Sequence, residues 1–115
     1  MSEVTIYHNP RCSKSRQTMA LLEEKGVEPN VILYLETPPD AATITSLLKK
    51  LGLSARELMR TKEDIYKALD LASVDDEAAL ISAMTENPKL IERPIVVSGQ
   101  KAALGRPPEN VLGIL

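Results

Sequence analysis

The order of hydrophobic patterns along the chain predicts an α/β fold, with a four-stranded mixed sheet in a single domain over residues 1–115. Near the N-terminus, two strand-like runs flank a segment with helical periodicity, which is typical of a βαβ unit. Residues from about 38 to 90 then carry only helix signals. Near the C-terminus, two more strand-like runs and a helix form a ββα unit. We therefore expect a helical insertion, about residues 38–90, between two halves of one sheet.

The first 35 residues contain the predicted βαβ unit. Residues 4–7 are rich in β-branched side chains, and Asn9-Pro10 follows as a turn. Helical periodicity begins at Ser13 and ends near Gly26. Residues 31–35 form a nearly continuous apolar run, which is typical of a strand buried on both faces. A helix that connects two strands in this way makes them parallel neighbours.

The predicted insertion begins with an amphipathic helix. Thr37 is placed to cap it, and Pro38 falls in its first turn, where a missing N–H costs nothing. Gly52 is expected to end this helix. Four apolar residues share its inward face: Ile44, Leu47, Leu48 and Leu51.

Three shorter helix signals complete the insertion. Ser54 and Glu57 have the spacing of a capping box, which opens a short helix with Arg60 at its end. Residues 63–69 are predicted to form a short helix or turn. Residues 75–86 are predicted to form a longer helix, which ends before a proline.

The C-terminal part carries a hairpin and a closing helix. Residues 95–97 and 101–104 are the expected strands, with Ser98-Gly99 as the tight turn between them. Pro94 opens the third strand, where it removes no interior ladder bond, and its bond to Arg93 is a candidate cis peptide. The closing helix is expected to turn three apolar side chains inward: Val111, Leu112 and Leu115. This order of elements is the thioredoxin-type arrangement, with helices inserted between its halves.

The single cysteine, Cys12, lies where the first strand and turn give way to the first helix. A sulfur at a helix N-terminus faces unpaired backbone N–H groups and the positive end of the helix dipole, and both favour the thiolate. Arg11, Lys14 and Arg16 add positive charge, which lowers the thiol pKa further and attracts anions. A lone cysteine in a small domain is more often an apolar packing residue, but polar and basic neighbours surround this one. We therefore predict that Cys12 is a nucleophile.

Composition narrows the class of protein. Fourteen lysines and arginines against sixteen acidic residues argue against broad electrostatic binding to nucleic acid. One cysteine cannot form an intramolecular disulfide, and one cysteine with one histidine cannot furnish a structural zinc site. The N-terminal residues do not have the pattern of a signal peptide, and no apolar run approaches membrane-spanning length. We expect a cytoplasmic monomer that binds no metal, no nucleic acid and no membrane.

Four sequence blocks occur in an order that is far more specific than any block alone. They are His8-Asn9-Pro10-Arg11-Cys12, then Arg60 after the inserted short helix, then Glu92-Arg93-Pro94-Ile95, and finally Gly105-Arg106-Pro107-Pro108. With these blocks the chain resembles the glutaredoxin-coupled arsenate reductase family, which shares its fold with the Spx proteins. The resemblance extends over essentially the whole length.

The resemblance implies an enzyme of arsenic detoxification that reduces arsenate to arsenite. Cys12 matches the family's nucleophile, His8 a histidine that influences the thiolate, and Ser15 a serine that hydrogen-bonds it. Three arginines match the residues that bind the oxyanion: Arg60, Arg93 and Arg106. The resemblance implies no bound cofactor, with glutathione as co-substrate and glutaredoxin as protein partner.

Elementary chemistry agrees with these implied roles. Guanidinium groups present paired, planar N–H donors that fit two oxygens of a tetrahedral anion and stay charged at any working pH. A chain with one cysteine cannot complete a two-electron reduction by forming its own internal disulfide. An external thiol is therefore needed.

Three other functions use a cysteine or this fold. A cysteine phosphatase requires an arginine six positions after the nucleophile, where this chain has Thr18, and that class is excluded. Cys12-Ser13-Lys14-Ser15 has the form of a single-thiol site, which leaves a glutaredoxin-like thiol-exchange enzyme open. A regulator of the Spx type, which binds RNA polymerase, is also open, although Ser15 stands where its redox-switching members have a second cysteine.

Overall fold

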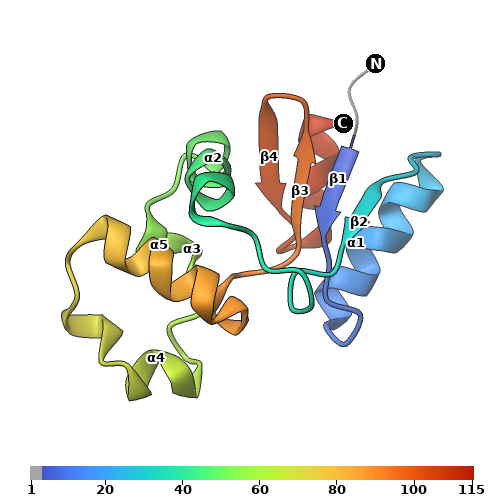
Figure 1. Cartoon of the computed structure of the whole chain (residues 1–115). Helices are drawn as coiled ribbons and strands as arrows, with labels where there is room; N and C mark the ends of the chain where they lie inside the picture. The colour runs from blue at the N-terminus through green and yellow to red at the C-terminus, as the bar shows by residue number, and fades with distance from the viewer. Residues whose placement is uncertain (1–3) are drawn as a thin grey trace. The chain divides into compact units, whose positions relative to one another are not determined.

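The computed structural model describes residues 4–115 and shows an α/β fold with a four-stranded sheet (Figure 1). Its helices are α1 (Ser13–Glu24), α2 (Ala41–Leu51), α3 (Ala55–Leu58), α4 (Asp64–Ala68) and α5 (Glu77–Glu86), with 3₁₀ helices η1 (Leu71–Ser73), η2 (Pro88–Leu90) and η3 (Pro108–Ile114). Its strands are β1 (Val4–Tyr7), β2 (Asn30–Ile32), β3 (Ile95–Ser98) and β4 (Lys101–Leu104). The predicted fold class and order of elements are confirmed.

The chain divides into two compact units. The described residues up to Thr37, together with Arg93–Leu115, form the sheet unit, and Pro38–Glu92 form the helical unit. The residues predicted as an insertion thus make a unit of their own. That the whole chain is one domain stays a prediction.

The sheet has the strand order β2-β1-β3-β4. β1 pairs with β2 in parallel, with Ile6 opposite Val31, as the predicted βαβ unit requires. β1 pairs with β3 in antiparallel orientation, with Ile6 opposite Val96, and β3 forms an antiparallel hairpin with β4. The sheet is therefore mixed, as predicted.

One face of the sheet is covered by α1 and η3 (Figure 1). Because side chains alternate along a strand, Ile6 and Val96 point to this face from neighbouring strands. They meet Leu22 of α1 and Val111 of η3, and all four side chains are fully buried. This apolar cluster fixes α1, whose first residue follows Cys12, against the sheet.

The second strand is shorter than predicted. β2 ends at Ile32, and the backbone N–H groups of Glu36 and Thr37 both donate to Leu33 O, which makes a turn of the residues expected to continue the strand. Val31 is 45% exposed and Leu35 is 39% exposed. The prediction of a strand buried on both faces was wrong, because β2 lies at the sheet edge and a run of apolar residues does not by itself reveal its position.

The start of α2 also differs from the prediction. Asp40, not Thr37, is the N-cap, and its Oδ1 accepts a hydrogen bond from Thr43 N–H (2.8 Å). Two prolines separate Thr37 from the helix, and the residue before a proline avoids the helical region, so the helix begins after both. The expected end at Gly52 is confirmed, since this residue adopts a left-handed conformation (φ 70°).

Within the helical unit, α3 begins as predicted with a complete capping box. Ser54 Oγ accepts from Glu57 N–H (3.3 Å), and Ser54 N–H donates to Glu57 Oε1 (2.9 Å). The guanidinium of Arg56 in α3 donates to Tyr66 Oη of α4 (2.5 Å) and to Leu71 O of η1 (3.1 Å). The short helix is thus tied to α4 and η1.

The closing segment is a 3₁₀ helix, and this changes which residues face inward. Val111 is fully buried and Ile114 packs against the same cluster, because residues three apart share a face in a 3₁₀ helix. Leu112 is half-buried, whereas Leu115 is 44% exposed. The expectation that Leu115 faces inward was therefore wrong.

Candidate active site

The sheet register brings three distant chain segments to one edge of the sheet unit. Tyr7 at the end of β1 lies opposite Ile95 at the start of β3, and Ile95 lies opposite Leu104 at the end of β4. The loop that leads to Cys12 follows Tyr7. Arg93 lies two residues before Ile95, and Arg106 lies two residues after Leu104. Antiparallel pairing thus explains why residues more than 80 positions apart in sequence meet here.

Cys12 is the N-cap of α1, as predicted, and is half-buried. Its backbone N–H donates to Asn9 O (3.0 Å), and its carbonyl accepts from Arg16 N–H (3.0 Å), the first hydrogen bond of the helix. These two bonds hold the backbone of Cys12 between the loop and the helix. The sulfur is presented beside the first backbone N–H groups of α1.

The surroundings of Cys12 favour its thiolate. Burial by itself raises the pKa of the thiol, but the Ser15 backbone N–H, the hydrogen bond and charge of Arg93, and the Lys14 backbone N–H together bring that pKa below its ordinary value. Two of these groups are backbone N–H groups in the first turn of α1. The prediction that the helix start activates the cysteine therefore has a defined structural basis.

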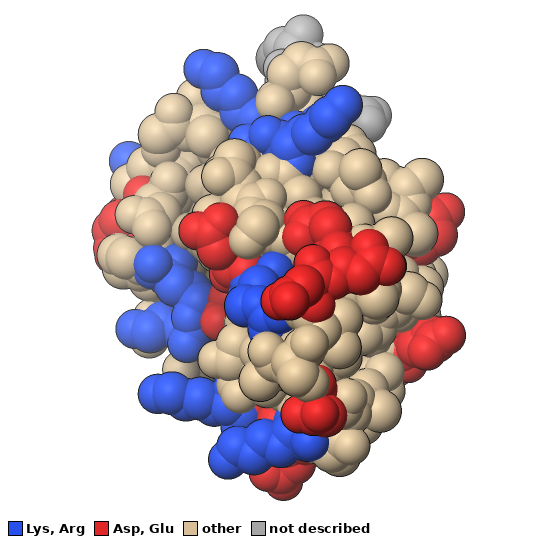
Figure 2. Space-filling view, turned by 90° about the vertical axis from the view of Figure 1, so that its left-hand side faces the viewer, with Lys and Arg blue, Asp and Glu red and all other residues tan. Residues whose placement is uncertain are grey.

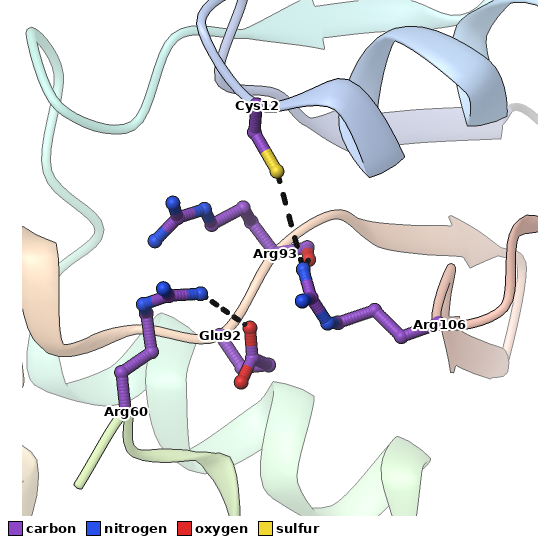
Figure 3. Close-up of polar contacts among 5 residues, drawn as sticks. All are labelled: Cys12, Arg60, Glu92, Arg93 and Arg106. Atoms are coloured by element: carbon purple, nitrogen blue, oxygen red, sulfur yellow. Dashed lines mark hydrogen bonds and ion pairs between the residues drawn. The ribbon is translucent and has the colours of Figure 1, made fainter. Parts of the chain in front are cut away.

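Two of the three candidate arginines lie close to Cys12 (Figure 3). Arg106 Nη1 is 3.9 Å from Cys12 Sγ and also donates to Arg93 O (3.1 Å). Arg93 and Arg106 each precede a proline, and both X–Pro bonds are cis. The cis bond predicted at Arg93–Pro94 is thus present, and a second cis bond, which was not predicted, joins Arg106 to Pro107.

The third candidate arginine, Arg60, belongs to the helical unit. Its Nη1 forms an ion pair with Glu92 Oε1 (2.8 Å; Figure 3), in which both side chains are about a quarter exposed (24% and 23%). Its backbone N–H donates to Leu90 O (2.7 Å). The structure thus gives Arg60 a carboxylate partner of its own, and its role toward an oxyanion stays a prediction.

His8 and Ser15 form a polar network under the loop. His8 Nδ1 lies 2.6 Å from Ser15 Oγ, which also accepts a hydrogen bond from Asn9 N–H (3.0 Å). Burial, followed by the charge of Arg16, lowers the pKa of His8 from its ordinary value, which favours the neutral imidazole. The Ser15 hydroxyl is therefore engaged by His8 and Asn9. The group of Ser15 that favours the thiolate is its backbone N–H.

Asn9 and Arg16 each form a hydrogen bond within the loop that the sequence patterns did not predict. Asn9 is almost buried (8% exposed), and its Oδ1 accepts from Arg11 N–H (3.0 Å), while Arg16 Nη1 donates to Pro10 O (2.9 Å). An asparagine that bonds the backbone two residues on is a recognised turn device, so the Asn9-Pro10 pair carried a usable signal. The turn predicted at Asn9-Pro10 is present, and only the contact of the Asn9 side chain within it was not predicted.

The turn that replaces the end of β2 borders a small cavity of about 290 Å³ beside the active loop. Its lining combines loop and turn residues: His8, Asn9, Pro10, Arg11, Leu33, Leu35 and Glu36. The lining of the cavity is mostly apolar. It provides space for a small molecule next to the segment that presents Cys12.

Two further properties of residues 4–115 concern metal ions and membranes. Within that range, no cluster of three or more His, Cys, Asp and Glu side chains is arranged to hold a metal ion. No helix in the same range is long and apolar enough to cross a membrane. On the face shown in Figure 2, acidic and basic side chains of the described residues lie interspersed.

A cysteine at the start of the first helix, at the edge of a four-stranded sheet of order β2-β1-β3-β4 and faced by an arginine, defines a thioredoxin-like thiol protein. The ArsC family model matches residues 7–114, and the chain belongs to the ArsC family.

Relatives of known sequence and structure agree with this assignment. The chain is 53% identical to an arsenate reductase of Haemophilus influenzae over 97% of this chain and 98% of that protein. It is 67% identical to the uncharacterized protein YfgD of Escherichia coli over 98% of this chain and 97% of that protein. The solved structure of an arsenate reductase from Vibrio cholerae, 54% identical, superposes with a TM-score of 0.96 and covers 99% of this chain and 98% of that one.

Proposed function

We propose that this chain is an arsenate reductase that uses Cys12 as its nucleophile. One observation carries the proposal: Cys12 Sγ lies 3.9 Å from Arg106 Nη1, and Arg93 favours the thiolate, so a nucleophile and two cations meet at one place. The names of relatives at about half sequence identity over the full length support arsenate as the substrate.

In this proposal the Cys12 thiolate attacks the arsenic atom of arsenate, and an arsenic–oxygen bond breaks to release water. Arg93 and Arg106 bind the remaining oxygens. Their positive charge draws electron density away from arsenic and so eases the approach of an anionic sulfur. Whether Arg60 also contacts the anion stays a prediction from the resemblance.

The electrons for the reduction come from external thiols, because the chain has only one cysteine. In this proposal they belong to glutathione and glutaredoxin, as the resemblance implies. A glutathione thiol adds to the arsenic and displaces a second water. A glutaredoxin thiolate then attacks the glutathione sulfur, and the electron pair of the arsenic–sulfur bond stays on arsenic, which becomes As(III). The two external sulfurs leave as a mixed disulfide, and hydrolysis of the Cys12–arsenic bond releases arsenite.

A coupled assay with arsenate, glutathione, glutaredoxin, glutathione reductase and NADPH tests this function. We expect NADPH oxidation that requires arsenate and both thiol components, and that is lost in Cys12→Ser. Turnover of a glutathione mixed disulfide without any arsenate-dependent turnover would contradict the proposal and favour a glutaredoxin-like thiol-exchange enzyme.

The same assay tests the two arginines. Removing a charged hydrogen-bond donor costs about 1.5–3 kcal/mol, so Arg93→Ala and Arg106→Ala should each lower kcat/KM for arsenate roughly 10- to 100-fold. Lys49→Ala, which removes an exposed cation from α2, serves as the matched control and should leave kcat/KM unchanged. If all three variants had the same kcat/KM, neither Arg93 nor Arg106 would bind the oxyanion.

A further inference from the structure

Gly105 occupies a crowded position directly after β4. It is buried, and its backbone N–H donates to Pro94 O (2.9 Å), which joins the end of β4 to the start of β3. Its sequence neighbour is Arg106, whose guanidinium approaches Cys12. Gly105 therefore directly precedes Arg106 and is hydrogen-bonded to Pro94, which follows Arg93.

The space that a side chain would need at residue 105 is already filled. A Cβ on Gly105 would lie 2.7 Å from Pro94 Cγ and 3.3 Å from Pro94 Cδ, and still closer to Thr18 Oγ1. Carbon atoms in a well-packed interior do not approach this closely, so a larger residue must displace one of its neighbours. Glycine is required here by packing.

Both neighbours of Gly105 are held firmly. Thr18 is fully buried in α1, and its Oγ1 donates to Lys14 O (2.8 Å), which fixes its rotamer. Pro94 is also fully buried, and its ring leaves little freedom. Displacement at this contact must therefore be shared with the backbone that carries Arg93 and Arg106, or with α1, which starts at Cys12.

We propose that Gly105 is a positioning residue whose missing side chain lets the end of β4 approach Thr18 and Pro94 and thereby sets how far Arg93 and Arg106 lie from the Cys12 sulfur. The inference rests on the proposed function for the role of the two arginines toward the anion. The effect on the Cys12 thiolate follows from the geometry alone, whatever the substrate.

The test is the pH dependence of Cys12 alkylation by iodoacetamide in Gly105→Ala, with urea unfolding measured on the same samples. Displaced arginines stabilise the thiolate less, so the half-point of the alkylation profile should move to higher pH. A shift of half a unit lowers the rate at pH values below the half-point about threefold. The matched control is Gly113→Ala, where a Cβ meets no described atom within 4 Å, and we expect its profile to equal that of the unchanged chain.

A second substitution separates positioning from a general loss of packing. Thr18→Ala removes the atom nearest to the added methyl group, so the double variant Thr18→Ala with Gly105→Ala should recover part of the alkylation shift. If Gly105→Ala does not fold, Thr18→Val provides a milder test, because it places a methyl group where Thr18 Oγ1 touches Gly105. That variant should move the profile in the same direction by a smaller amount.

A folded Gly105→Ala variant with an unchanged alkylation profile would overturn the inference, as would an unchanged profile in Thr18→Val if only that variant folds. Arsenate kinetics supply a separate readout, in which Gly105→Ala should raise KM for arsenate at least about threefold. If the unchanged chain does not reduce arsenate but Gly105→Ala still shifts the alkylation profile, the proposed substrate fails and the positioning role stands.

Discussion

The side chain and the backbone of Ser15 have different roles: the hydroxyl links parts of the fold, and the backbone N–H stabilises the Cys12 thiolate. Its fully buried hydroxyl interacts with His8 Nδ1 and accepts the Asn9 N–H, so the end of β1 and the start of α1 are linked through one oxygen atom. A buried hydroxyl without such partners would cost about 1–3 kcal/mol. Its backbone N–H meanwhile favours the Cys12 thiolate. The resemblance assigned one role to Ser15, whereas the geometry supports a division between two groups.

Cys12 should be alkylated by iodoacetamide faster than an ordinary thiol at neutral pH. Because its pKa lies below the ordinary value of 9.0, the rate should reach half its maximum at a lower pH than in the same chain unfolded in urea. Arg93→Ala should move the half-point upward, since Arg93 favours the thiolate. A rate in the folded chain that rises only above about pH 8, as for a free thiol, would contradict this expectation.

His8 should make the folded state less stable as the pH falls. Its pKa in the folded chain is below the value of 6.5 expected in the unfolded chain, so the unfolded state binds the proton more readily. The free energy of unfolding should therefore decrease as the pH is lowered from 7.5 to 5.5.

The measurement is urea unfolding at each pH in a Cys12→Ser background, which removes the titration of the thiol. His8→Gln should show a flatter dependence in the same window. Asp40 and Glu57, whose pKa values are also lowered, titrate below this window because their ordinary values are 3.8 and 4.5. Equal slopes with and without His8 would show that another group is responsible.

The helix ends of this chain are set by short side-chain contacts. α2 starts at Asp40 and α3 starts at Ser54, each through a side-chain oxygen that accepts a backbone N–H. Such contacts decide where a helix begins when the apolar face is compatible with several starting points. α3 has only four residues, so its cap makes up a large part of its hydrogen bonding.

Removing the cap of α3 should destabilise the chain. Ser54→Ala loses the acceptor for Glu57 N–H, and we expect a decrease of about 0.5–2 kcal/mol in the free energy of unfolding. Ser46→Ala, at an exposed position inside α2, should change it by less than about 0.5 kcal/mol. Urea unfolding of both variants tests the difference, and equal values would show that the capping box contributes little.

The first strand, β1, and the last helix, η3, both belong to the sheet unit and pack together there. β1 lies between β2 and β3, and the C-terminal η3 packs on the cluster that contains Ile6 of β1. Contacts between residues so far apart in sequence carry a large loop-closure cost and depend on the whole sheet unit. The same pairing brings Arg93 and Arg106 to the Cys12 loop, so the stability of the sheet unit and the geometry of the site depend on the same strands.

The closing helix should therefore contribute measurably to stability. Val111→Ala removes two methyl groups from a fully buried position, and we expect a loss of about 1–3 kcal/mol in the free energy of unfolding. Leu115→Ala, at a position that is 44% exposed, should change it by less than about 0.5 kcal/mol. A larger effect at Leu115 than at Val111 would contradict the packing described for η3.

Local sequence patterns were sufficient for most elements of this chain. The periodicity around Leu22, the capping box at Ser54 and the glycine at Gly52 each predict a feature that the structure confirms. These features depend on residues within one or two turns of each other, so their physical causes are visible in a short window of sequence. The failures at Leu35 and Leu115 have another cause, since exposure there depends on the edge position of β2 and on the 3₁₀ geometry of η3.

The sequence by itself determined the fold class and the place of Cys12 at a helix start, since these follow from periodicity and from the turn and helix signals around residue 12. The tertiary structure alone decided that Arg93 and Arg106 meet at the Cys12 loop, and that the Ser15 hydroxyl serves His8 and Asn9. It also showed that residue 105 has no room for a side chain. The physical reason is the antiparallel register of β1, β3 and β4, which sets contacts between segments that no local pattern connects.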